Sequence, residues 1–258
     1  MAYLLYGIVK EPAVVGASMT GVKGRAVSFV AGHGLCAAVS ELAAEECAPP
    51  VSELLIYSKV VEELHRRQAV VPMRYGCFLT GIEAIRNTLR ERRCQYETLL
   101  AQLEGHVEMG IRILLPEKER PPRQEETMKG RNALSTAGTT AQPNDEPSVD
   151  GHAYLARRKI HYQMHDETLH GCQALIDHYI QAFSGLYARH RTETDTKNEA
   201  VILSLYFLTA ESQVSRFRKT FGRISENGDV KALLSGPWPP YNFVTADSAT
   251  ATDSSFRA

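Results

Sequence analysis

The chain has 258 residues, of which 43% are hydrophobic and 23% are charged, a composition typical of globular proteins. Its 29 basic and 30 acidic residues give a formal net charge of −1, whereas proteins that coat nucleic acid carry a basic excess. The composition therefore argues against a nucleic-acid partner. The length suggests one or two domains of about 100–200 residues each.

The five cysteines, Cys36, Cys47, Cys77, Cys94 and Cys172, are too widely spaced for a CxxC pair. Their odd number and spacing argue against a disulfide framework or a zinc ribbon and fit a reducing cytosol. The apolar N-terminus has no preceding basic region and is too short to span a bilayer, and no later run reaches that length. We expect a soluble intracellular protein without contact to a lipid membrane.

Strands open the N-terminal part of the chain. Residues 2–9 are almost uninterrupted in hydrophobicity, which is typical of a strand buried on both faces. Two short apolar runs at 26–32 and 35–40 flank Gly32-His33-Gly34 and predict a hairpin. This lone GxG lacks the third glycine and the following helix of a dinucleotide-binding loop, so we interpret it as a turn.

A helix and a further strand follow. Apolar residues at helical spacing predict a helix over 51–67, with Ser52 as its N-cap. Residues 69–75 predict a strand. Because Pro72 has no backbone N–H, it is expected at an edge, a bulge or a strand end.

The next helix has the clearest start signal in the chain. Thr80 and Glu83 have the spacing of a capping box, which predicts Thr80 as the N-cap. An apolar stripe then continues to Leu103, and Gly105 follows as the C′ residue. The pattern predicts one continuous helix.

Residues 106–114 alternate between apolar and polar side chains, which predicts a half-buried strand with Glu108, Gly110 and Arg112 on its polar face. Residues 116–150 hold five of the twelve prolines and few large apolar side chains. We therefore predict a flexible linker or long insertion there.

The C-terminal part predicts alternating elements in the order βαββαβ, the ferredoxin-like arrangement. After strand 106–114, they are a helix at 151–187, strands at 188–194 and 200–208, a helix at 210–224, and a strand at 229–235 after an Asn227-Gly228 turn. We predict an α+β protein of two domains, a separate α+β unit at 1–105 and a ferredoxin-like domain at 106–244. A disordered tail is expected at 245–258.

No catalytic set is visible in the sequence. His161 and His165 share a helix face, but the glutamate of an HExxH zinc motif is missing. No Walker, GxSxG or SxxK motif occurs, and Cys36, Cys77 and Cys172 lie in apolar runs that are typical of inert packing. We predict no catalytic, cofactor-binding or metal-binding residues.

Two segments are unusual. Residues 71–76 place Arg74 beside a glycine that permits uncommon backbone angles, so Arg74 either packs along its stem or contacts a partner. Residues 236–243 hold the single tryptophan, Trp238, among three prolines that fix an extended backbone. Trp238 and Tyr241 either fold back over a core or form an exposed anchor. We favour the first, because proteins seldom expose so much apolar area.

Four motifs follow one another along nearly the whole chain: YLLYGIV at 3–9, VPMRYG at 71–76, GHAYL at 151–155 and GPWPPYNFV at 236–244. The last is the most specific. In content and order they resemble the gas vesicle protein F/L family (GvpF/GvpL).

This resemblance implies a two-domain α+β protein of a prokaryote that builds gas-filled protein shells. Members look like minor structural components or assembly factors, not enzymes. They bind the small hydrophobic shell protein and other accessory proteins and prevent shell-protein aggregation during nucleation. The resemblance places them in the cytoplasm and at the gas vesicle, in part of the family on the gas-facing side of the shell. The candidate interaction residues carried by the motifs are Pro72, Arg74, Tyr75, Gly76, Tyr154, Gly236, Pro237, Trp238, Pro239, Pro240 and Tyr241.

Two other functions stay open on the residues alone. A ferredoxin-like regulatory or RNA-binding module would display aromatic and basic residues on its sheet, and strand 200–208 offers Tyr206 and Phe207 without basic partners. A small-molecule enzyme would need a cleft with converging polar groups, for instance around Arg74.

Overall fold

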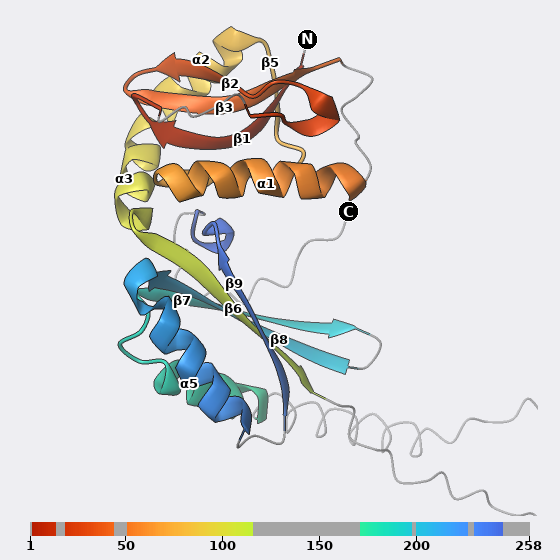
Figure 1. Ribbon diagram of the computed structural model, residues 1–258, viewed down its shortest axis with the longest axis vertical. Helices are drawn as coiled ribbons and strands as arrows, with labels where there is room; N and C mark the ends of the chain where they lie inside the picture. The colour runs from red at the N-terminus through yellow and green to blue at the C-terminus, as the bar shows by residue number, and fades with distance from the viewer. Residues whose placement is uncertain are drawn as a thin grey trace, which may run out of the picture.

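The computed structural model describes residues 2–13, 19–43, 51–115, 171–197, 200–226 and 230–244. These residues form an α+β structure with two separate antiparallel sheets, one of five strands and one of four. Figure 1 shows the two sheets at opposite ends of the molecule, with helix α1 between them. The predicted α+β class is confirmed.

The first sheet is built around β1 (Ala2–Lys10), which is buried along almost its whole length as its hydrophobicity predicts. On one side it pairs with β3 (Leu35–Leu42), which in turn pairs with β2 (Ser28–Gly32). On its other side it pairs with two short strands, β4 (Val70–Pro72) and β5 (Phe78–Thr80). The central position of β1 explains why both of its faces are apolar.

The predicted turns of this sheet are largely confirmed. His33 and Gly34 join β2 to β3 with φ values of 58° and 79°, the left-handed backbone that a tight hairpin turn requires. Pro72 ends β4, so its missing N–H costs no interior ladder bond. The predicted strand at 69–75 is shorter than expected, and β5 was not predicted.

Helices cover both faces of this sheet. Helix α1 (Val51–Arg67) packs Tyr57, Val61 and Leu64 against one face, beside the short 3-10 helix η1 (Val22–Gly24). Helices α2 (Ile82–Glu91) and α3 (Arg93–Leu103) cover the other face. The result is a three-layer arrangement with two apolar interfaces, one on each side of β1 (Figure 1).

The predicted helix starts were wrong in detail. Helix α1 begins at Val51, so Ser52 lies within its first turn and is not its N-cap. Thr80 belongs to β5 and pairs with Ala2 of β1, so the backbone of Thr80 stays extended. Gly81 (φ 84°) takes the N-cap position of α2 without a side-chain hydrogen bond. Glu83 instead binds Arg86.

The long stripe that ends at Leu103 forms two helices because Arg92 (φ −105°, ψ 16°) interrupts it. Gly105 (φ 66°) does follow α3 as the predicted C′ residue and leads directly into β6.

The second sheet has the strand order β7-β8-β6-β9, with every pair antiparallel. Its strands are β6 (His106–Leu115), β7 (Arg189–Lys197), β8 (Ala200–Ala210) and β9 (Lys231–Trp238). The helix at 171–182 lies between β6 and β7 in the chain, and η3 (Glu211–Gln213) with α5 (Val214–Glu226) lies between β8 and β9. This is the predicted βαββαβ order.

The helical side of the second sheet is closed by aromatic packing. Phe217 of α5 stacks on Phe183 with ring centroids 4.2 Å apart, and Phe207 of β8 lies 5.5 Å from Phe183. All three side chains are fully buried. Phe207 therefore faces the core, and of the two aromatic residues expected to serve an RNA-binding surface only Tyr206 lies on the other face.

The face of the second sheet that points away from these helices is called the open face here. It carries alternate residues of β6, namely Glu108, Gly110, Arg112 and Leu114, together with the residues paired to them. Arg112 is exposed as predicted, but Glu108 and Gly110 are buried. Alternation along β6 does not predict the burial of Glu108 and Gly110, because a later segment around Asn242 packs on that end of the face.

Several predictions fall outside the described residues. They are the linker at 116–150, the first part of the helix at 151–187, the Asn227-Gly228 turn and the tail at 245–258. The division into domains at 1–105 and 106–244 stays a proposal. The passage from α3 to β6 lies at that boundary, yet Leu208 and Phe243 pack in one buried cluster with Leu103.

Replacing Gly236 by alanine should destabilise the fold. Gly236 has φ 104°, and an added Cβ would lie 2.6 Å from the backbone oxygen of Glu108. We expect a loss of about 2–5 kcal/mol in the free energy of unfolding, measured by urea denaturation. Gly24→Ala is the matched control, because Gly24 also has a positive φ (69°) but open space around it. It should cost about 1–2 kcal/mol. Equal losses would contradict the role given to the close contact.

Candidate functional site

The junction between the two sheets is formed by the segment that follows β9. After β9, the short helix η4 (Tyr241–Phe243) lies beneath α1 (Figure 1). Phe243 is 2% exposed and packs in a cluster with Leu103 and Leu208, while the guanidinium of Arg189 lies 5.8 Å from its ring centroid. The segment thus contacts elements of both sheets.

Glu108 holds this segment on the open face. It is 5% exposed, and its two carboxylate oxygens accept hydrogen bonds from the backbone N–H of Asn242 (2.9 Å) and from Asn242 Nδ2 (2.7 Å). Burial raises the pKa of Glu108, and the two hydrogen bonds oppose that rise. A buried acceptor with both oxygens satisfied ties residue 242 to β6.

A tyrosine cluster lies on the other side of the junction. Tyr57 of α1 stacks on Tyr6 at 5.0 Å and meets Tyr75 edge-on at 5.1 Å. Its hydroxyl lies 2.9 Å from the backbone oxygens of both Leu5 and Met73. Burial raises the pKa of Tyr57, so its hydroxyl stays protonated as a donor. Tyr241 packs against the same cluster.

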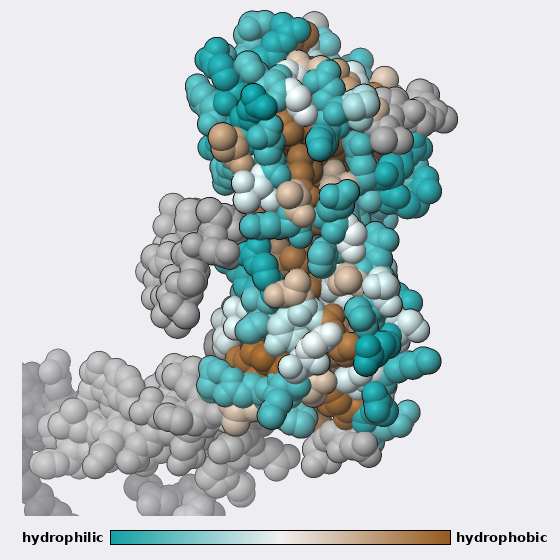
Figure 2. Space-filling model, turned by 90° about the vertical axis from the view of Figure 1, so that its left-hand side faces the viewer, coloured by the Kyte–Doolittle hydropathy of each residue, from teal (hydrophilic) through white to brown (hydrophobic). Residues whose placement is uncertain are grey.

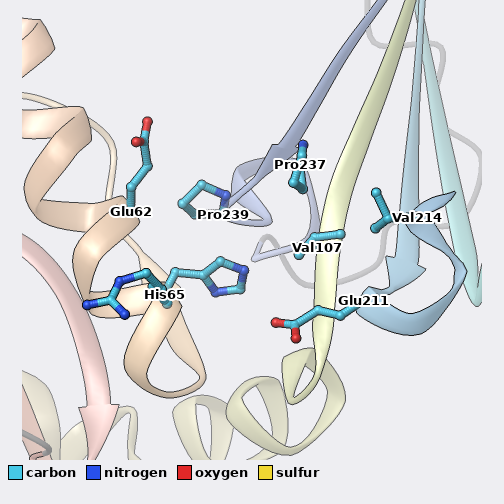
Figure 3. A pocket seen from close by; sticks show the side chains of 8 residues that line it. Glu62, His65, Val107, Glu211, Val214, Pro237 and Pro239 are labelled. Carbon is cyan, nitrogen blue, oxygen red and sulfur yellow. The ribbon is translucent and has the colours of Figure 1, made fainter. Parts of the chain in front are cut away.

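A cavity of about 390 Å³ lies between α1 and the second sheet. Figure 3 shows the His65 ring extending from α1 toward Val107 of β6 and Glu211 of η3. Both ring nitrogens of His65 are buried without a hydrogen-bond partner. Burial lowers the pKa of His65, and Glu211 partly offsets this. The lining residues are Glu62, His65, Arg66, Val107, Glu211, Val214, Pro237 and Pro239.

The structure brings the two unusual sequence motifs together at this junction. Tyr75 of the first motif and Tyr241 of the second both pack on the cluster around Tyr57. Pro72 is buried at the end of β4, while Arg74 and Gly76 (φ 90°) lie exposed in the turn that follows. The cavity is not lined by Arg74. Tyr154 lies outside the described residues.

The expectation that Trp238 folds back over a core was wrong. Trp238 ends β9 opposite Glu108 and is 44% exposed, because a bulge at Gly236 and Pro237 shifts the register there. The residues after it form the clamp instead. Pro239, Pro240 and Phe243 are buried, and Tyr241 is half-buried.

The sequence did not single out Glu108, Asn242, His65 or Tyr57. Alternation assigned Glu108 to a solvated face, and a lone histidine or tyrosine on an amphipathic helix has no distinctive pattern. Asn242 belongs to the strongest motif, GPWPPYNFV, and its position there was the one available signal.

The described residues include neither a cluster of metal-ligating side chains nor a helix that could span a membrane. In the ranges that the structure describes, no group of three or more His, Cys, Asp or Glu side chains could hold a metal ion. The helices found within those ranges are all too short or too polar to cross a membrane. His161 and His165 lie outside the described residues.

Replacing Asn242 by alanine should weaken the junction. The change removes the donor to one Glu108 oxygen and leaves that oxygen buried without a partner. We expect a loss of about 1–3 kcal/mol in the free energy of unfolding, measured by chemical denaturation. Asn87→Ala on the exposed face of α2 is the control and should change stability by less than about 0.5 kcal/mol. Equal stability of the two variants would argue against the Glu108 contact.

Acidification should destabilise the protein through His65. Its folded pKa lies below the unfolded value of 6.5, so the unfolded state binds more protons once the pH falls below that value. The stability present above pH 6.5 is therefore lost as the pH falls toward the folded pKa. His65→Phe should reduce this loss in unfolding measured between pH 7.5 and 5, and His178→Phe, at an exposed position, should not. The same pH dependence in His65→Phe would contradict this prediction.

Comparison with known proteins supports the resemblance. A model of the family "Gas vesicle synthesis protein GvpL/GvpF" matches residues 2–245. Gas vesicle protein F2 of Halobacterium salinarum is 20% identical over 244 residues, which cover 93% of this chain and 90% of that protein. Gas vesicle protein F1 of the same organism is 21% identical over 214 residues, which cover 81% and 77%.

Two crystal structures share the fold. GvpF from Anabaena sp. PCC7120 superimposes with a TM-score of 0.72 at 18% identity, covering 95% of this chain and 97% of that one. GvpF from Microcystis aeruginosa gives 0.71 at 17% identity, with coverage of 95% and 99%. Since the family model spans nearly the whole sequence, the chain belongs to the gas vesicle synthesis protein GvpL/GvpF family.

Proposed function

We propose that this chain is a non-catalytic accessory protein of gas vesicle assembly that binds the hydrophobic shell protein and other accessory proteins. By covering apolar surface of the shell protein, it keeps that protein from aggregating during nucleation. It acts in the cytoplasm and at the vesicle, where the gas-facing side of the shell is its proposed place. The family match over residues 2–245 is the observation that carries the gas vesicle role.

The open face offers a surface for such a partner. Leu233 of β9 is 65% exposed and Leu114 of β6 is 46% exposed. The register pairs Leu233 with Arg112 and Leu114 with both Lys231 and Ile202, so Leu114, Ile202 and Leu233 are neighbours on one face. We call these three residues the open-face patch. It lies at the end of the sheet away from η4.

The patch has the composition of a binding surface. An apolar centre is flanked by the charged residues Arg112 and Lys231, which is the pattern of an interface core with a polar rim. Fully burying one leucine contributes about 1.5–3 kcal/mol, so two leucines and an isoleucine support moderate affinity. Trp238 adds a further exposed apolar side chain nearer the junction.

Most of the remaining surface visible from one side is polar. Figure 2 shows the side on which α3 lies as mainly hydrophilic, crossed by a narrow hydrophobic band, with hydrophobic areas over the C-terminal part. Such a surface suits a protein that must stay dispersed while it binds a sticky partner.

The double variant Leu114→Ser/Leu233→Ser should bind the shell protein more weakly. Both side chains are exposed, so the fold should persist while the apolar contact is removed. We expect co-purification of the shell protein to weaken by at least tenfold, which corresponds to about 1.4 kcal/mol. Leu55→Ser on α1 is the matched control, because Leu55 is 69% exposed and lies in the other part of the molecule.

Three results would contradict parts of this proposal. Unchanged binding of the shell protein by the double variant would show that the open-face patch is not a contact surface. Unchanged binding by Trp238→Ala would show the same for Trp238. Cells that lack the gene and still fill with gas vesicles would overturn the assembly role itself.

A further inference from the structure

The strand β9 forms one edge of the second sheet, where it pairs with β6 and with no other strand of the described residues. Glu211 N–H donates to the Gly105 carbonyl at 3.0 Å, directly beyond the first pair of β6 with β8. Since hydrogen-bonded and non-hydrogen-bonded pairs alternate in an antiparallel ladder, odd-numbered residues of β6 bond β8 and even-numbered ones bond β9. Ala232 and Leu234 lie opposite odd-numbered residues, so their N–H and C=O groups point away from the sheet. Within the described residues these groups have no hydrogen-bond partner.

Apolar side chains surround this edge on both faces of the sheet. On the open face, Leu233 is 65% exposed. On the helical side, Ala232 and Leu234 pack against the core together with Phe221 and Ile224 of α5, and all four stay partly exposed. Consecutive apolar residues are typical of a strand inside a sheet, as in β1. The middle of β9 therefore has the side chains of an interior strand at an edge position.

The opposite edge of the same sheet is different. Exposed charges on an edge strand oppose pairing with another chain, and charged residues alternate along the whole of β7. They are Arg189, Arg191, Glu193, Asp195 and Lys197. In β9 the one charged residue is Lys231 at its start, and the bulge at Gly236 and Pro237 lies toward its end. Between them the edge of β9 has neither charge nor proline.

Charges beside the edge favour one kind of occupant. Helix α5 packs on β9 and has a single acidic residue, Glu226, beside four basic ones. Of these, Arg218 lies at the edge, where its Nη2 donates to the Gly236 carbonyl at 3.1 Å. If β9 of a second copy added here, two basic α5 helices would lie side by side and repel each other. The edge therefore suits an extended segment of a different protein, without lysine or arginine.

We propose that β9 binds an extended segment of the shell protein as a fifth strand of the second sheet, hydrogen-bonded to Ala232 and Leu234. This inference rests on the proposed function and specifies how the shell protein is held. Main-chain hydrogen bonds fix the segment, and its alternating apolar side chains cover Leu233 on one face and Phe221 on the other. A segment held in this way has one of its own edges covered, which keeps further copies from pairing there.

Hydrogen exchange tests the added strand in the full-length chain, alone and in complex with co-purified shell protein. In the free chain the amides of Ala232 and Leu234 should exchange about tenfold or more faster than that of Leu233, which bonds β6. In the complex both amides should slow by about tenfold or more, measured at single residues by mass spectrometry. By the same alternation, Thr192 and Thr194 of β7 point their amides outward, and these should keep their rates.

Proline substitution tests the same edge by binding. Ala232→Pro removes an N–H that points away from β6, so pairing within the sheet is retained. We expect co-purification of the shell protein to fall by about tenfold or more, because the added strand loses a donor and meets the proline ring. Thr194→Pro is the matched control, since it removes an outward N–H at the opposite edge and should bind like wild type. Circular dichroism shows whether both variants are folded, and the exchange of the wild-type complex decides if Ala232→Pro is not.

The outcomes separate this inference from the assembly role. Shell protein that binds without slowing the amides of Ala232 and Leu234, or that binds folded Ala232→Pro undiminished, would overturn the added strand and leave the assembly role intact. Slowing of the two amides as the concentration of the chain alone rises would assign the edge to a second copy, against the proposal. A wild-type chain that binds no shell protein would refute the assembly role and the added strand together.

Discussion

A carboxylate that is removed from water needs hydrogen-bond donors, and in this protein the donors for Glu108 come from Asn242, 134 residues further along the chain. This contact joins β6, the first strand of the second sheet in the chain, to η4, which follows the last strand, β9. It also determines where the neighbours of Asn242 lie: Tyr241 reaches the tyrosine cluster of α1, and Phe243 enters the apolar cluster with Leu103 and Leu208. This short segment therefore joins the two sheets, together with Leu208, which packs in the same cluster as Leu103.

The same contact divides the open face of the second sheet. Near Glu108 the face is covered by the returning chain, and toward Leu114 and Leu233 it is uncovered. A ferredoxin-like sheet with one face packed on its helices has a second face that is available either for internal packing or for a partner. In this molecule the bulge at Gly236 and Pro237 separates the part of the face that is packed internally from the part that is uncovered.

Much of the fold could be predicted from the sequence because it depends on local hydrophobic patterns. Short apolar runs predicted β1 and the β2–β3 hairpin, helical spacing predicted α1, and alternation predicted β6. The succession of such patterns predicted the βαββαβ order. The junction could not be predicted in this way, because it depends on contacts between distant segments. Alternation placed Glu108 in solvent, since nothing in strand 106–114 indicates that residue 242 returns to cover it. A single histidine in α1 likewise gives no signal of the cavity that forms when η3 and β9 pack opposite it.

The capping box failed for a related reason. Thr80 and Glu83 have the right spacing, but pairing with Ala2 keeps Thr80 extended, so tertiary pairing overrides a local signal. The reading of Trp238 as a clamp identified the correct segment and the wrong residue. The three prolines and three aromatic side chains of residues 236–243 indicated that this segment packs on a core, but the bulge decides which of the side chains face it.

The register of β6 also bears on how members of this family can diverge. His106 pairs with Ala210 at the junction, and Leu115 pairs with Val201 at the far end of the sheet, so β6 leads into residues 116–170 as far from η4 as the sheet allows. Changes in chain length directly after Leu115 therefore begin at the end of the sheet away from Glu108 and Asn242. That position suits an engineer who inserts a reporter peptide without disturbing the Glu108 contact.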